Sequence, residues 1–127
     1  HYDAIHDNDS MSDKYKAGLT TEQQPPVGLK YDTGKLLFSL IPPETTRALA
    51  QVLTFGAQKY APNNWQLVEN GKDRYLDALF RHLDAYRSGE ALDPESGLSH
   101  LSHALTNVAF LHYLDLKANQ WDVSNTF

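Results

Sequence analysis

Apolar residues recur every three to four positions in several segments of this chain, which is the spacing of one helix face. In the first of these segments the positions i, i+3, i+4 and i+7 are apolar or small: Leu49, Val52, Leu53 and Gly56. The sequence Pro42-Pro43-Glu44 suits the first turn of a helix, and Pro62 cannot continue one. We therefore expect a helix over residues 43–60.

Two further periodic segments predict a helical hairpin. The first runs from about Asp73 to Ser88 and has Gly89 as its C-terminal stop. We expect its apolar stripe to face the core: Leu76, Leu79, Phe80 and Leu83. Asp93 is a natural N-cap followed by Pro94, so we expect the second helix to run from Pro94 to about Leu116. Because the predicted connection is short, the two helices should be antiparallel neighbours packed on the first helix, in an all-α fold.

The N-terminal part of the chain differs in character. Residues 1–29 carry few large apolar side chains, so we interpret them as an arm or linker and residues 30–127 as the domain. Met11 begins the sequence MSDKYKAGL in the manner of a natural start, which favours residues 1–10 as a remnant of expression. The sequence KYDTGK at residues 30–35 predicts a turn. The apolar stretch up to Ile41 is either a short strand or an extended strap across the helices.

Composition limits the class of protein. A length of 127 residues fits one domain, and a net charge of -5 argues against general nucleic-acid binding, which depends on lysine and arginine. The chain has no cysteine, so any metal site must use histidine and carboxylate ligands. We find neither an apolar stretch long enough to span a bilayer nor a signal core, and we therefore expect a cytoplasmic protein without membrane contact.

Three helices enclose little volume, and the last predicted helix is apolar over most of its circumference. Phe110, Leu111 and Leu114 contribute to that apolar surface. We therefore expect a homodimer or larger assembly that buries the remaining faces.

A polar stripe interrupts the apolar surface of the last predicted helix. Its members are spaced at i, i+4, i+7 and i+11: Ser96, His100, His103 and Asn107. Polar groups on a buried helix need partners. His82 lies on the preceding helix between small residues that leave room beside the imidazole. The spacing alone leaves two interpretations open, a structural core network and a metal or substrate site.

In the functional interpretation, His100 and His103 ligate one metal ion from a single helical turn. His82 and a carboxylate from Glu90, Asp93 or Glu95 complete the site. We take the candidate metal ligands to be His82, Glu95, His100 and His103. His82, Glu95 and His103 are also the candidate catalytic groups, and Asn107 would orient one of the ligands.

The loops supply groups suited to a nucleotide. Candidate substrate-binding residues are the cations Lys35, Lys59 and Arg81 for phosphates, and Tyr60, Asn64, Trp65 and Asn107 for the remainder of the ligand. Each has a simpler alternative. Arg81 can belong to a surface ladder with Asp77 and Asp84, and Trp65 can anchor its loop on the core.

Several segments together resemble a known family. They read KYDTGK, IPPE, VLTFGAQKYAPNNW, RYLDALFRHLDAYRSGE and DPESGLSHLSHALTNVAFLHYLD. The chain from Lys30 to Asp115 is similar to the phage-type dATP/dGTP diphosphohydrolase N-terminal domain family. The resemblance implies hydrolysis of a deoxynucleoside triphosphate to the monophosphate and pyrophosphate.

More distantly, the hairpin resembles the all-α nucleotide pyrophosphatases of the MazG and HisE kind. That resemblance implies magnesium or manganese held by Glu-x-x-Glu on one helix and Glu-x-x-Asp on the next. This chain has His100-x-x-His103 at the equivalent turn and no Glu-x-x-Glu opposite it. Magnesium prefers oxygen ligands, whereas imidazole also suits zinc or iron.

The sequence thus supports a metal-assisted nucleoside triphosphate pyrophosphohydrolase acting on purine deoxynucleotides. The alternative is a non-catalytic phage protein that sequesters a nucleotide or a nucleotide signal of host defence, which the shortage of clustered carboxylates favours. A purely structural module would leave the histidine stripe without a purpose.

Overall fold

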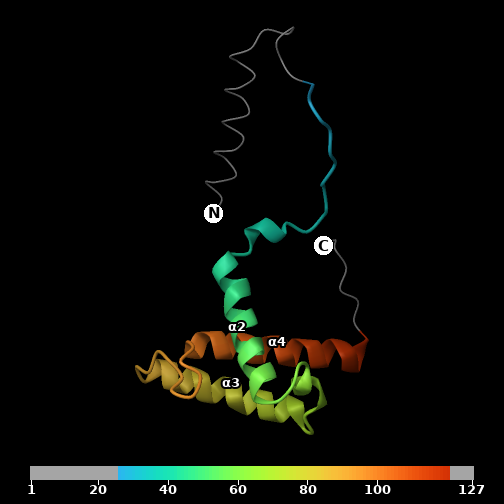
Figure 1. Ribbon diagram of the computed structural model, residues 1–127. Coiled ribbons are helices and arrows are strands. Elements are labelled where there is room, and N and C mark those ends of the chain that lie inside the picture. The colour runs from blue at the N-terminus through green and yellow to red at the C-terminus, as the bar shows by residue number, and fades with distance from the viewer. Residues whose placement is uncertain (1–25, 121–127) are drawn as a thin grey trace. The chain divides into compact units, whose positions relative to one another are not determined.

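A computed structural model describes residues 26–120 of the chain (Figure 1). The expected expression remnant at residues 1–10 lies outside the described residues. The chain divides into two compact units, whose described parts are residues 26–40 and residues 41–120. Within residues 26–120 the structure contains helices and turns but no strand, which confirms the all-α prediction.

The first unit has little regular structure in its described part. The predicted turn is present, since the Lys35 backbone N–H donates to the Asp32 carbonyl at 3.0 Å and Gly34 adopts a positive φ of 79°. The apolar stretch that follows forms the short 3₁₀ helix η1 (Phe38–Leu40) rather than a strand.

The second unit begins with α2 (Pro43–Lys59). Pro43 occupies the first helical position, and Glu44 complements the positive end of the helix dipole. The helix ends before Pro62, as predicted, and the 3₁₀ helix η2 (Asn64–Leu67) follows.

Helix α3 (Gly71–Arg87) ends in a Schellman motif. The backbone N–H of Gly89 donates to the Tyr86 carbonyl, and that of Glu90 donates to the Ala85 carbonyl, each at 3.0 Å. Gly89 has a φ of 100°, which L side chains rarely adopt. The predicted glycine stop is confirmed.

Helix α4 (His100–Asn119) starts later than the sequence predicted. We expected Asp93 to cap it, but Asp93 closes a separate turn in which its Oδ1 accepts the backbone N–H of Glu95 at 2.8 Å and of Ser96 at 3.0 Å. Gly97, with a φ of 72°, ends this turn. Ser99 is the true N-cap, because its Oγ accepts the Leu101 N–H at 3.1 Å. The prediction of a helix from Pro94 was therefore wrong.

Helices α3 and α4 lie side by side and antiparallel, and α2 crosses them and packs on α4 (Figure 1). The inner face of α4 is mostly polar: His100, His103, Thr106 and Asn107 are buried there together with Ala104. No helix within the described residues is long and apolar enough to cross a membrane.

Candidate functional site

A cleft of about 1180 Å³ lies within the second unit. Residues of α2, η2, α3, α4 and the loop between α3 and α4 line it. Among its lining residues are ten that the sequence singled out: Lys59, Tyr60, Asn64, Trp65, Arg81, His82, Glu95, His100, His103 and Asn107. The fold therefore brings together candidates that are distributed over four segments of the sequence.

Three imidazole rings form the centre of this cleft. The rings of His82 and His103 are stacked, with centroids 4.6 Å apart and an interplanar angle of 5°. Nδ1 of His82 lies 2.8 Å from Nδ1 of His100, so one nitrogen of this pair donates and the other accepts. Nε2 of His100 lies 2.7 Å from Oε1 of Glu90. The histidine stripe is thus one connected cluster across the two helices.

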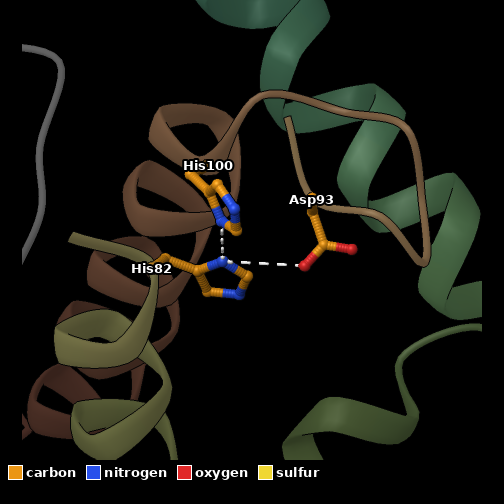
Figure 2. Close-up of side chains that lie close together, drawn as sticks. All are labelled: His82, Asp93 and His100. Atoms are coloured by element: carbon orange, nitrogen blue, oxygen red, sulfur yellow. Dashed lines mark hydrogen bonds and ion pairs between the residues drawn. The ribbon is translucent and has the colours of Figure 1, made fainter. Parts of the chain in front are cut away.

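The loop between the helices adds two polar side chains to the cluster. Oδ2 of Asp93 lies 3.9 Å from Nδ1 of His82. Figure 2 shows both side chains together with His100. The sequence predicted Ser96 on the last helix, but Ser96 lies in the loop before α4. Its Oγ nevertheless lies 2.6 Å from Nε2 of His103. The turn that replaces the predicted first turn of the helix therefore keeps Ser96 beside the histidines.

Burial changes the acid–base properties of the cluster. It lowers the pKa of His82 and of His103 below 6.5, because the charged imidazolium is poorly solvated there; neighbouring histidine rings lower both pKa values further, and Asp93 partly offsets them. Burial by itself would raise the pKa of Asp93, but the N–H groups of Ser96 and Glu95 donate to its carboxylate and lower it overall. Neutral rings beside an ionised carboxylate are favoured near neutral pH.

One group of side chains among the described residues could hold a metal ion, because its ligand atoms all lie within 4.8 Å of one another: His82, Asp93 and His100. It differs from the set that we derived from the sequence. The Glu95 carboxylate instead lies 2.6 Å from Nζ of Lys59, and His103 is bonded to Ser96. The sequence offered Asp93 as one of three possible carboxylates but gave no means of choosing it.

The two cationic candidates in the cleft, Lys59 and Arg81, differ in their partners. The hydrogen bond to Glu95 raises the pKa of the exposed Lys59 above 10.5. The alternative interpretation of Arg81, a surface ladder with Asp77 and Asp84, has no ion pair to support it within residues 26–120, and Asp84 pairs with Arg87 at 2.8 Å instead. Arg81 therefore faces the cleft without the surface partners that the simpler interpretation required.

Among the aromatic and amide candidates, Trp65 and Asn107 make contacts within the protein, whereas Tyr60 is exposed. The Trp65 ring stacks on Phe110 with centroids 4.3 Å apart, and it forms a T-shaped contact with Tyr113 with centroids 4.9 Å apart. Trp65 thus packs on α4 through one face of its ring, as the anchoring interpretation predicts, and it also lines the cleft. Nδ2 of Asn107 donates to the His103 carbonyl at 2.8 Å, whereas Tyr60 is largely exposed at the rim.

Lys35 lies in the first unit and pairs with Asp32 at 3.9 Å. It is not among the residues that line the cleft.

The second unit is thus an all-helical domain with a histidine-rich cleft. A family profile described as "dATP/dGTP diphosphohydrolase, N-terminal" matches residues 26–124, and the chain belongs to this family. It is also 40% identical over 88 residues to a protein of Salmonella phage PMBT28 named "dATP/dGTP diphosphohydrolase". The match covers 69% of this chain but 30% of that relative's length. No solved structure matches the chain.

Proposed function

We propose that this chain acts as a nucleoside triphosphate pyrophosphohydrolase, which converts dATP or dGTP and water to the deoxynucleoside monophosphate and pyrophosphate. The observation that carries this proposal is the cleft itself, in which cations, aromatic side chains and a histidine cluster share one space. The name of the phage relative supports the same reaction. We place this activity in the cytoplasm of the host cell.

The cationic groups are the proposed phosphate ligands. Lys59 and Arg81 both line the cleft, and their charges would offset the charge that develops on the phosphates during hydrolysis. A triphosphate that reaches Lys59 would replace Glu95 as its partner and thereby release the Glu95 carboxylate to accept a proton. Tyr60 and Asn64 would contact the base from the rim.

The histidines are the proposed acid–base groups. Because burial favours the neutral rings of His82 and His103, either can accept a proton from an attacking water at neutral pH. The water oxygen forms the new bond to phosphorus, and pyrophosphate departs with the electrons of the broken phosphoanhydride bond. A divalent ion bound in the cleft would supply positive charge and a more acidic water. Histidine and aspartate side chains in the cleft provide suitable donors for such an ion.

The direct test is to incubate the purified chain with dATP, dGTP and the pyrimidine triphosphates, with magnesium, manganese or zinc, and to measure pyrophosphate. We expect purine-selective release that Arg81→Gln reduces about tenfold or more. Arg87→Gln, on the same helix but outside the cleft lining, is the matched control and should leave the rate unchanged. Release that is equal in wild type and Arg81→Gln would contradict the proposed role of Arg81.

A second candidate function is binding without turnover. The metal-capable group contains one carboxylate, fewer than the acidic clusters of the related pyrophosphatases imply. A chain that sequesters a nucleotide, including a nucleotide signal of host defence, would use the same cleft. Calorimetric binding of dGTP with no pyrophosphate under any metal would favour this function over hydrolysis.

We also propose that the chain forms a homodimer or larger assembly through the outer face of the hairpin. Exposed apolar side chains form a stripe on each helix: Leu76, Phe80 and Leu83 on α3, and Leu101, Leu105 and Val108 on α4. None of them lines the cleft, whereas Phe110, Leu111 and Leu114, which we had expected to be exposed, are half-buried. Sedimentation should show an oligomer that Leu105→Lys dissociates. A wild-type monomer at micromolar concentration would overturn this proposal.

A further inference from the structure

The contact between His82 and His100 places two ring nitrogens beside a carboxylate oxygen. Both rings present Nδ1, and these two atoms lie 2.8 Å apart. Oδ2 of Asp93 lies 3.9 Å from the same nitrogen of His82, and the three ligand atoms all lie within 4.8 Å of one another. Figure 2 shows that His100, at the start of α4, and Asp93, in the loop, both approach the ring of His82 on α3.

The protonation of His100 is set from its far side. Oε1 of Glu90 lies 2.7 Å from Nε2 of His100, and an ionised carboxylate can only accept a hydrogen bond. In the neutral ring the proton is therefore on Nε2, which leaves the lone pair of Nδ1 directed toward His82 and Asp93. A carboxylate that orients a histidine in this way is the usual outer partner of a metal-ligating imidazole.

The spacing of the donor atoms suits a small divalent ion. Zinc–nitrogen bonds of about 2.0–2.1 Å place tetrahedral donors about 3.3 Å apart. To bind the ion, the two nitrogens at 2.8 Å must move apart and Oδ2 of Asp93 must come closer to both of them. The side chains of His82 and Asp93 are half-buried, so we expect them to make this adjustment. The ion would replace the single proton that the two nitrogens now share.

We propose that His82, Asp93 and His100 form a binding site for a nitrogen-preferring divalent ion of the zinc class, with Glu90 as the residue that orients His100. Two imidazoles and one carboxylate favour zinc over magnesium, which requires oxygen ligands. Since all three ligands line the cleft, the fourth coordination position faces the space that a ligand would enter. This inference deepens the proposed function, but the binding of zinc does not depend on hydrolysis.

The proposed site assigns other roles to the two remaining sequence candidates. His103 stacks on His82 and bonds to Ser96, and Glu95 bonds to Lys59. Neither belongs to the group that can share an ion. They are neighbours of the centre rather than its ligands, and with His82 on the ion, His103 is the histidine left to accept a proton from the attacking water.

The test is a zinc titration of the full chain after removal of metal with a chelator, followed by calorimetry and by the visible absorption of bound Co²⁺. We expect one ion per wild-type chain and an increase in melting temperature on binding. Asp93→Asn removes the ligand oxygen while its remaining oxygen can still close the loop turn, and it should weaken binding at least about tenfold. Glu90→Gln should weaken binding about 10–100-fold without removing a ligand.

Two control variants separate this centre from general zinc binding by histidines. His112→Gln removes an exposed histidine elsewhere on α4, and His103→Gln removes the stacked neighbour of the site. Both should retain the stoichiometry of one ion, and circular dichroism checks that every variant folds. Unchanged affinity in folded Asp93→Asn, or no zinc binding by wild type, would overturn the site. Zinc binding without pyrophosphate release would support the site and reject hydrolysis. Pyrophosphate release that needs only magnesium and persists in His100→Gln, together with no zinc binding by wild type, would support hydrolysis and reject the site.

Discussion

The contact between Ser96 and His103 offers a direct energetic test of how the loop is attached to α4. Oγ of Ser96 lies 2.6 Å from Nε2 of His103 and also accepts the backbone N–H of Leu98 at 3.1 Å. A hydrogen bond of this kind contributes about 0.5–1.5 kcal/mol net. Ser96→Ala loses both bonds, so we expect its free energy of unfolding to decrease by about 1–2 kcal/mol.

The variant His103→Ala should be more destabilising. It loses the same hydrogen bond and the stacked contact with His82, and it leaves a space where the buried ring was. We expect a loss of about 2–3 kcal/mol. For a domain of this size each kcal/mol corresponds to about 4–8 °C in melting temperature.

The two variants and their combination form a double-mutant cycle. Urea denaturation followed by circular dichroism, with chelator present to exclude metal, gives the three free energies. We expect the double variant to be about 1 kcal/mol less destabilised than the sum of the single variants, because both remove the same bond. Effects that add to within about 0.3 kcal/mol would refute the argument that this bond fixes the loop to the helix.

Other expectations follow from single positions. Trp65→Ala should lower the free energy of unfolding by about 2–3 kcal/mol, measured by urea denaturation, because it removes a half-buried ring stacked on α4; Trp65→Phe should recover part of this loss. Gly89→Ala should destabilise the protein by about 1–2 kcal/mol in thermal melts, because Gly89 has a φ of 100°. The control Gly56→Ala, inside α2 with open space around it, should stabilise the protein slightly. Equal effects of the two variants would contradict the backbone argument. The lowered pKa values of His82 and His103 mean that the unfolded chain binds protons first as pH falls below 6.5. In chelator, the free energy of unfolding should therefore be full above this pH and decrease as the pH falls below 6.5. Constant stability across that fall would show that the rings are not buried as neutral groups.

Much of the fold follows from local rules that act within a few residues. The apolar spacing and the prolines predicted α2 closely, and the glycine at position 89 predicted the end of α3. The start of α4 did not follow, because two N-caps compete in the same segment. Asp93 has suitable cap chemistry, but Gly97 ends its turn and Ser99 provides the cap that the helix uses.

The sequence predicted which residues share the cleft, but not which of their side chains contact one another. Helical spacing showed that His100, His103 and Asn107 share one face, and the cleft contains all three. Whether Asp93 or Glu95 approaches the histidines depends on the direction of side chains in a tight turn, which periodicity does not describe. The Glu95 carboxylate is bonded to Lys59 instead, and Lys59 belongs to α2, which is distant in sequence.

An antiparallel bridge between Leu92 and Ser99 closes the loop between α3 and α4. The cluster from His82 to His103 therefore has a short connection and lies in one continuous stretch of chain. Contacts that are close in sequence form quickly, because little chain entropy is lost in bringing them together. The histidine cluster should therefore assemble with the hairpin, before α2 docks and completes the cleft. In this order the histidine cluster forms first, and α2, which also lines the cleft, packs on it second. Variants of α2 should therefore alter the shape of the cleft without separating the histidines.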